Sequence, residues 1–188
     1  MKDTPKLIAL YAPAQSGKSE VAKVLRDDFG YTLVKFAGPL KAMVRTLLTE
    51  AGIPRWRHAR YIEGDLKEAV IPELGSSISS RQLMQTLGTE WGRDALSDNF
   101  WVELALARIE AQHRAGMSVV IDDMRFPNEL EMVHEMGGEC WRIIRPGHEV
   151  PTGHASEGAL DGYDHWDRVI LNDDTLETLR IRSNPTKL

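Results

Sequence analysis

A Gly-Lys-Ser triplet at residues 17–19 constrains this sequence more than any other feature, because of what stands on either side of it. Residues 6–11 form a short apolar run with the length and composition of a buried parallel strand. Residues 12–19 then follow the phosphate-loop pattern G-x-x-x-x-G-K-[ST], except that Ala12 replaces the first glycine. A helical pattern follows, so the stretch predicts a strand, a phosphate-binding loop and a helix.

The residue types in this loop suit the binding of phosphate groups and Mg²⁺. Gly17 allows backbone amides to approach a phosphate with no Cβ in the way, and the start of the helix near Lys18 presents unpaired N–H groups to an anion. Lys18 can reach the β- and γ-phosphates, and the Ser19 hydroxyl can ligate Mg²⁺. The alternative is an ordinary turn before an amphipathic helix. Ala12 leaves the loop geometry open, because a glycine there usually eases the tight turn.

Strand and helix patterns alternate along the rest of the chain. Strands are expected at residues 31–36, 118–121, 139–144 and 168–171, and helices at 39–51, 81–93, 99–114, 127–136 and from 174 onward. This order predicts an α/β three-layer sandwich with a mostly parallel sheet, whose ligands lie at the carboxyl ends of the strands. Residues 52–80 lack strong periodicity, which is typical of a functional loop, and residues 145–166 read as a polar loop.

Composition excludes several other classes of protein. The 188 residues suit one domain, 1–188, and their 42% hydrophobic content excludes a wholly disordered chain. The apolar runs are too short for a membrane span or a signal peptide, and the one cysteine, Cys140, cannot form an internal disulfide, so we expect a soluble cytoplasmic protein. The net charge of -5 argues against a general nucleic-acid binder, although basic residues gather in the first half.

A second polar cluster follows the expected strand at 118–121. Asp122 and Asp123 come directly after it, at the usual position of a carboxylate that holds Mg²⁺ through water or orients a substrate group. Arg125 and Glu129 add a fork-shaped donor and another acceptor, which suits a nucleotide with a phosphate and a polar base. No glutamate follows the aspartates, so the base of a motor-type ATPase is missing. The alternative is a capped helix start with a surface salt bridge.

Further motifs occur in a fixed order along the chain. They are A-G-P-L-K at 37–41, R-Q-L-M-Q-T-L-G-T-E at 81–90, Trp101, Asp123-Met124-Arg125 with Glu129, R-P-G at 145–147, H-A-S-E at 154–157 and Asn172-Asp173. With the phosphate loop, this series resembles the phage-type deoxynucleoside monophosphate kinases, which are P-loop enzymes with an adenylate-kinase-like fold. The resemblance covers nearly the whole chain except residues 52–78.

The resemblance implies transfer of the γ-phosphoryl group of ATP, with Mg²⁺, to a deoxynucleoside monophosphate. It implies ATP-binding residues Ala14, Gln15, Ser16, Gly17, Lys18, Ser19, Glu20 and Asn172. The acceptor would be bound by Ala37, Gly38, Lys41, Gln85, Gly88, Thr89, Trp101, Asp123, Arg125 and Glu129. Of these, Lys18, Asp123 and Arg125 would be catalytic. Ser19 and Asp122 are the expected metal ligands, and Arg145, His154 and Glu157 correspond to a lid within residues 145–166 that excludes water.

The segment at 52–80, expected to flank the acceptor, is shorter than the family's usual insertion there. In its place stand basic and aromatic residues at 55–61, which could track a DNA backbone and stack a base. Relatives of this family phosphorylate 5-hydroxymethyluracil within DNA, so a phage DNA-modification kinase is the alternative function. A P-loop ATPase or switch with no phosphoryl acceptor is a third hypothesis. The expected partner is a nucleotide or such DNA and not a membrane, and a homodimer stays open.

Overall fold

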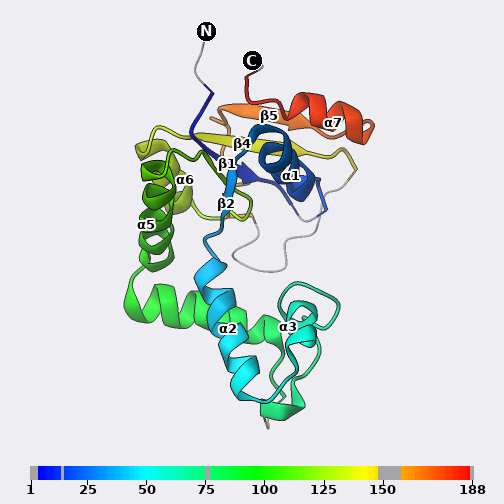
Figure 1. The fold of residues 1–188 in the computed structure, drawn as a ribbon, viewed down its shortest axis with the longest axis vertical. Helices are drawn as coiled ribbons and strands as arrows, with labels where there is room; N and C mark the ends of the chain where they lie inside the picture. The colour runs from blue at the N-terminus through cyan, green and yellow to red at the C-terminus, as the bar shows by residue number, and fades with distance from the viewer. Residues whose placement is uncertain (1–3, 14, 75–76, 148–157, 187–188) are drawn as a thin grey trace. The chain divides into compact units, whose positions relative to one another are not determined.

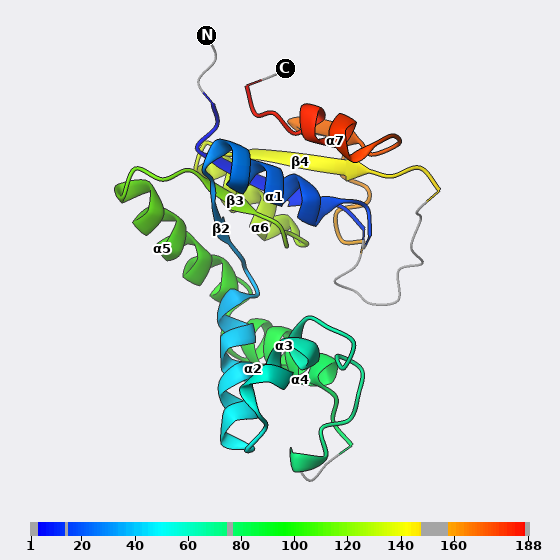
Figure 2. The same ribbon diagram turned by 45° about the vertical axis from the view of Figure 1, so that its right-hand side comes forward.

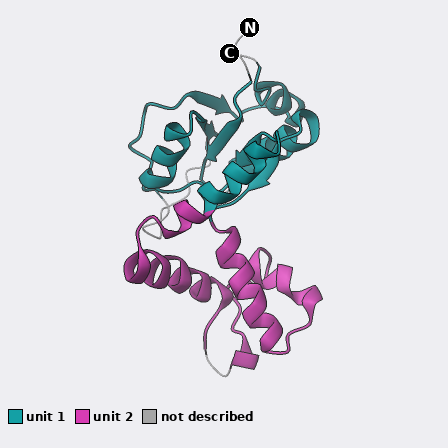
Figure 3. Ribbon diagram, turned by 60° about the vertical axis from the view of Figure 1, so that its left-hand side comes forward, with its two compact units in different colours: residues 1–36, 105–188 teal, residues 37–104 magenta. Residues whose placement is uncertain are grey.

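The computed structural model describes residues 4–13, 15–74, 77–147 and 158–186. The chain divides into two compact units, one made of residues 1–36 and 105–188 and the other of residues 37–104 (Figure 3). We call them the sheet unit and the helical unit. None of the helices in the described ranges is both long and apolar enough to cross a membrane.

A five-stranded parallel sheet forms the centre of the sheet unit (Figure 1). Its strands are β1 (Leu7–Tyr11), β2 (Thr32–Val34), β3 (Val119–Ile121), β4 (Glu139–Ile144) and β5 (Arg168–Leu171). They lie in the order β2-β3-β1-β4-β5, and every neighbouring pair is parallel. The predicted α/β fold with a parallel sheet is therefore confirmed. The order also makes β1 and β3 neighbours, so the residues that follow these two strands lie at the same edge.

Helices cover both faces of this sheet. On one face lie α1 (Lys18–Phe29) and α7 (Leu176–Arg182), and on the other lies α6 (Pro127–Glu135) (Figure 2). The alternation of side chains along β4 explains the division. Trp141 packs with Leu25 and Leu179 in the core under α1 and α7, whereas the thiol of Cys140 points to the opposite face, 3.9 Å from the backbone oxygen of Leu130 in α6.

The helical unit is built around its own apolar core. Its elements are α2 (Gly38–Glu50), α3 (Arg55–Ile62), the short 3₁₀ helix η1 (Pro72–Leu74), α4 (Ser80–Thr86), the π-helix η2 (Leu87–Leu96) and the first turn of α5 (Phe100–Arg114). The helix α3 lies inside the segment in which the sequence shows no strong periodicity. Its buried residues His58, Tyr61 and Ile62 do follow helical spacing, but three arginines in eight residues obscure the pattern.

The helix predicted at 81–93 is present, but its second half is the π-helix η2. Trp101 accompanies this change of geometry. Its indole N–H donates to the backbone oxygen of Gly88 (2.8 Å), so this oxygen has a hydrogen-bond partner from outside η2. One turn on, Gly92 lies against the same indole, and a Cβ there would stand only 2.4 Å from the indole nitrogen. Long π-helical stretches are rare and concentrate at functional sites.

Candidate active site

The loop between β1 and α1 has the backbone geometry of an anion-binding cradle. Gln15 and Gly17 both have positive φ, 62° and 97°, on either side of Ser16. Successive residues in alternating left- and right-handed conformations turn their N–H groups into one concave surface, a nest that binds anions. Among the described non-glycine residues Gln15 alone has a positive φ, so Ala12 needs no glycine conformation. Ala14, predicted to bind ATP, lies outside the described residues.

Two side chains from neighbouring strand ends brace this loop. The Asn172 amide, just after β5, donates to the backbone oxygen of Ser16 (3.1 Å), and Arg145, just after β4, donates to that of Gln15 (3.1 Å). Asn172 also explains why position 17 is a glycine, since a Cβ there would stand 2.5 Å from its amide nitrogen. Both residues therefore help to fix the backbone conformation of the loop. They do so through contacts that the sequence motifs do not reveal.

Lys18 lies where the loop meets the second polar cluster. Its ammonium donates to the backbone oxygen of Ala12 (2.9 Å), which folds the side chain back along the loop. Burial lowers the pKa of Lys18, and the charges of Arg125 and Lys35 lower it further, while Asp123 and Asp122 oppose the shift. Lys18 therefore interacts electrostatically with two other cations and two carboxylates beside the loop.

The carboxylate pair after β3 is held in two different ways. Asp123 accepts the backbone N–H of Phe36 (2.9 Å), which ties the end of β3 to the end of β2. Asp122 pairs with Lys35 through one oxygen (3.1 Å), and its other oxygen is buried with no hydrogen-bond partner among the described residues. A buried carboxylate oxygen without a donor suits a cation or an ordered water. Lys35, which sequence reasoning missed, could have been found as the first residue after β2.

Glu129 supports the backbone that carries Arg125. The carboxylate of Glu129 is almost fully buried, and it accepts the backbone N–H groups of Arg125 (2.6 Å) and Phe126 (3.2 Å). These amides directly precede α6, so Glu129 caps this helix from within. The sequence grouped Glu129 with the acceptor-binding residues, and in the structure its carboxylate binds backbone N–H groups before α6.

Sequence reasoning also missed a cluster at the last residue of β1. The Tyr11 hydroxyl donates to Asp161 (2.6 Å), and its ring stacks on Trp166 with centroids 5.1 Å apart. The guanidinium of Arg142, which pairs with Tyr11 in the sheet, lies 6.0 Å from the centroid of the same Trp166 ring. The contacts attach part of the loop predicted at 145–166 directly beside the phosphate loop. Two residues predicted for a lid, His154 and Glu157, lie outside the described residues.

The predicted acceptor residues of the helical unit fall on four elements, α2, α4, η2 and the first turn of α5. Ala37, Gly38 and Lys41 stand at the start of α2, Gln85 is in α4, and Gly88 and Thr89 are in η2. Lys41 pairs with Glu63 (2.8 Å). Trp101 is only 4% exposed and has its indole N–H bound to Gly88, so it packs as a core residue that shapes η2. Within this unit the structure therefore brings Gly88 and Trp101 together.

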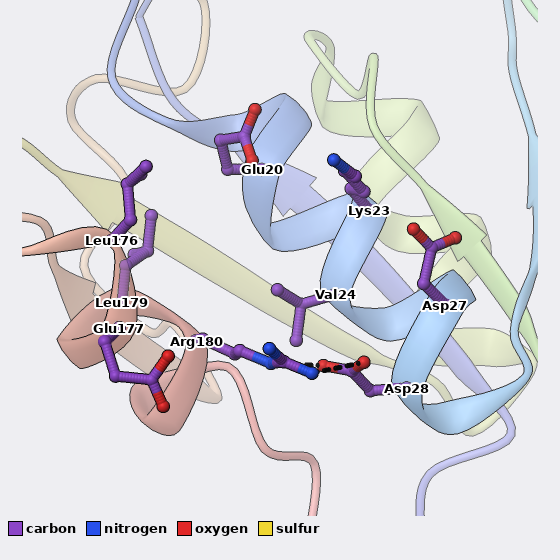
Figure 4. A pocket seen from close by; sticks show the side chains of 9 residues that line it. All are labelled: Glu20, Lys23, Val24, Asp27, Asp28, Leu176, Glu177, Leu179 and Arg180. Atoms are coloured by element: carbon purple, nitrogen blue, oxygen red, sulfur yellow. Dashed lines mark hydrogen bonds and ion pairs between the residues drawn. The ribbon is translucent and has the colours of Figure 1, made fainter.

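A groove of about 290 Å³ runs between α1 and α7 (Figure 4). One side is closed by the ion pair of Arg180 with Asp28 (2.7 and 2.8 Å). Its lining includes Glu20, one of the predicted ATP residues, but none of Lys18, Asp122 and Arg125. The groove is therefore not the phosphate site, which the loop and the carboxylate pair define.

A parallel sheet whose first strand runs into an anion-binding loop with a lysine, and whose neighbouring strand ends in a carboxylate pair, defines a P-loop nucleotide-binding protein. The model of a family described as deoxynucleotide monophosphate kinase matches residues 47–182. The chain belongs to this family, and thus to a family of phosphotransferases.

Two viral proteins agree with this assignment. A protein of Acanthamoeba polyphaga mimivirus that bears the same family name is 30% identical over 183 residues, 91% of this chain and 90% of that protein. The deoxynucleotide monophosphate kinase of Enterobacteria phage T4 is 32% identical over 111 residues, 58% of this chain but 46% of that enzyme. The crystal structure of TT1252 from Thermus thermophilus matches 94% of this chain and 93% of that one, at 21% identity and a TM-score of 0.47.

Proposed function

We propose that this chain transfers the γ-phosphoryl group of ATP to a deoxynucleoside monophosphate. The observation that carries the proposal is the position of Lys18. Its ammonium lies on the phosphate loop and within the field of Asp122, Asp123 and Arg125. Phosphoryl transfer requires little covalent chemistry from the protein and depends on positioning and on neutralising charge on the transferred group. Membership of the deoxynucleotide monophosphate kinase family supports a nucleotide acceptor.

The residues of the sheet unit divide this work among them. The backbone N–H groups of residues 15–19 bind the phosphates of ATP, and Lys18 leaves the Ala12 oxygen to contact the β- and γ-phosphates. Arg125, with its rigid fork of donors, binds the acceptor phosphate. Asp123 orients that acceptor while it holds the end of β2 in place.

The buried, unpartnered oxygen of Asp122 fits a Mg²⁺ ion, with the Ser19 hydroxyl as the second protein ligand. When bound, Mg²⁺ neutralises negative charge on the phosphate oxygens. Lys35 pairs with the other oxygen of Asp122 at 3.1 Å, so its ammonium lies beside the proposed ion site. Mg²⁺ needs several oxygen ligands, and waters and phosphates would supply those beyond these two residues.

We also propose that residues 1–188 act as one kinase domain in the cytoplasm. The helical unit contributes the acceptor residues at 37–41 and 85–89, with residues 52–80 flanking them, and residues 145–166 act as the lid. Support for the lid comes from its described parts. Arg145 contacts the phosphate loop, and Asp161 and Trp166 contact Tyr11, so the segment begins and ends beside the loop.

The alternative acceptor is a base within DNA. One observation favours it, since Trp56 on α3 is 70% exposed and could stack on a base. The charges beside it argue the other way. Arg60 forms a two-armed pair with Asp65, and Arg57 contacts Tyr61 and lies 3.6 Å from Glu73, so neither is left over for a DNA phosphate. Two of the three arginines of α3 are therefore paired within the unit, which favours a free nucleotide, whereas the third, Arg55, is exposed.

The test is a paired assay with ATP and Mg²⁺. Each of the four standard deoxynucleoside monophosphates is supplied in one arm, and DNA that contains 5-hydroxymethyluracil in the other, with label on the γ-phosphate of ATP. We expect label in a deoxynucleoside diphosphate and none in the DNA, and loss of product with Lys18→Ala. Label only in the DNA would make the alternative correct. ATP hydrolysis with no labelled acceptor in either arm would favour the ATPase hypothesis.

A further inference from the structure

Three potential metal ligands meet at the amino-terminal edge of the sheet, the edge opposite the phosphate loop. His134 is in the last turn of α6, Cys140 is the second residue of β4, and Asp167 directly precedes β5. One ligand atom from each residue, the imidazole nitrogen, the thiol sulfur and a carboxylate oxygen, lies within 4.8 Å of the other two. The three come from three separate elements of the sheet unit, so the fold and not the local sequence brings them together.

We propose that His134, Cys140 and Asp167 form a binding site for a zinc ion, separate from the catalytic centre. The soft thiolate, the imidazole and one carboxylate make a mixed ligand set typical of Zn²⁺, whereas Mg²⁺ takes oxygen ligands almost exclusively. Three protein ligands leave the fourth position of a tetrahedral ion to water. The ion would tie α6 to β4 and β5.

The present geometry is close to what zinc requires. Bonds of about 2.0–2.3 Å at tetrahedral angles place ligand atoms roughly 3.3–3.6 Å apart. The nearest pair here, His134 Nε2 and Asp167 Oδ2, is 2.9 Å apart, and the widest separation in the cluster is below 4.8 Å. Shifts of about an ångström would therefore complete the site. Side chains at the ends of elements accommodate such shifts by rotating.

The carboxylate is already held in position for this role. Asp167 Oδ2 accepts the backbone N–H of Cys140 (2.8 Å), which keeps the carboxylate beside the sulfur. Such a contact to a ligating carboxylate is the usual outer support of a metal site. The thiol itself has two weak partners, both at 3.9 Å, the thioether of Met124 and the backbone oxygen of Leu130. Loss of these contacts costs little when the sulfur binds an ion.

The three proposed ligands differ in their exposure to solvent. Cys140 is fully buried, whereas the side chains of His134 and Asp167 are 34% and 38% exposed. The imidazole and the carboxylate therefore form the solvent-exposed side of the proposed site, where the water ligand of an ion would lie. As the sulfur–zinc bond forms, the S–H bond breaks and its proton passes to solvent. The proton that His134 Nε2 donates to Asp167 is exchanged through water to Nδ1, so a neutral imidazole binds the ion. The net balance is one ion gained and one proton released.

The experiment uses the full chain without a histidine tag, stripped with a chelator and then titrated with Co²⁺. Cys140 is the one cysteine in the sequence, so a thiolate-to-cobalt charge-transfer band in the near ultraviolet reports this site alone. We expect a band that saturates at about one equivalent and disappears when Zn²⁺ displaces the cobalt. We also expect Zn²⁺ to raise the thermal midpoint, because an ion that binds the native state stabilises it.

Two variants and a matched control decide the assignment. Cys140→Ser should abolish the band, and His134→Gln, at an exposed position, should weaken Co²⁺ binding at least about tenfold. The control is His165→Gln, because His165 also pairs with a carboxylate, Asp164 (3.3 Å), but has no cysteine beside it; it should titrate like the wild type. A wild-type protein without the band, or a His134→Gln variant that binds Co²⁺ as tightly as the wild type, contradicts the proposal. Kinase assays with excess Mg²⁺ should be unchanged in His134→Gln, so the two proposals fail separately.

Discussion

Charged groups are used in opposite ways in the two units of this molecule. At the carboxyl edge of the sheet, Lys18 donates to a backbone oxygen, and one oxygen of Asp122 is buried with no donor from the described part of the chain. In the helical unit the charges pair with one another, as in the contacts of Lys41 with Glu63 and of Arg60 with Asp65. The first arrangement leaves charge available for a ligand, and the second neutralises it within the unit.

This difference indicates where the chemistry is carried out. Catalysis of phosphoryl transfer depends on donors and cations fixed in place before the substrate arrives. The sheet unit provides them on a rigid strand edge, whereas the helical unit provides shape, through the π-helix η2 and the indole packed against it. Substitutions in the sheet unit should therefore affect the rate most. Substitutions in the helical unit outside the proposed acceptor residues at 37–41 and 85–89 should affect stability or nothing.

The largest expected effect is that of Lys18→Ala. Loss of one preorganised charge on the transferred group should reduce kcat about 10²–10³-fold or more. The measurement is steady-state formation of the diphosphate product. Lys23→Ala is the matched control, because Lys23 is on the same helix but lines the groove toward α7. If both variants lost activity equally, the loss would reflect damage to α1 and not the role of the ammonium.

Arg125→Ala should have the next largest effect, and it should reduce use of the acceptor rather than binding of ATP. Loss of a hydrogen bond to a charged group corresponds to about 1.5–3 kcal/mol, so kcat/KM for the acceptor should drop roughly 10–100-fold. The affinity for ATP, measured by titration in the absence of acceptor, should change little. Equal loss of ATP affinity would move Arg125 to the ATP side of the site. Arg125→Lys should rescue only in part, because an ammonium lacks the two-pronged fork.

In the helical unit the expected effect is on folding. Gly92→Ala places a Cβ 2.4 Å from the Trp101 indole nitrogen, and such overpacking costs about 1–3 kcal/mol of unfolding free energy. Gly88→Ala is the matched control in the same π-helix, where a Cβ meets only Leu40 at an ordinary 3.5 Å. Denaturant titration of both variants measures the difference. Equal stability of the two would mean that Trp101 does not restrict η2 at position 92.

The same two regions differ in how far their structure can be predicted from the sequence. The phosphate loop and the strand-end aspartates depend on short, local patterns, so the sheet and its functional edge follow from the sequence. Arg145 and Asn172 were predicted from motifs, but their contacts with the loop backbone join residues about 130 and 156 positions apart, which no local pattern encodes. The π-helix depends on Trp101, which lies beyond the end of η2. The arginines of α3 obscure the helical spacing of its buried residues in the sequence.

The smallest effect is expected for Arg60→Ala, on the basic and aromatic helix α3. Arg60 and its partner Asp65 are both largely exposed, and exposed ion pairs contribute little to stability because water and salt screen them. With Arg60 already neutralised by Asp65, its removal should leave phosphorylation of the free nucleotide within about twofold of the wild type. The measurement is kcat/KM for the preferred monophosphate, together with retention of single-stranded DNA on a filter at low salt. A fall in DNA retention with unchanged nucleotide kinetics would show that Arg60 exchanges its partner for a phosphate, and the helical unit would then also hold charge for a ligand.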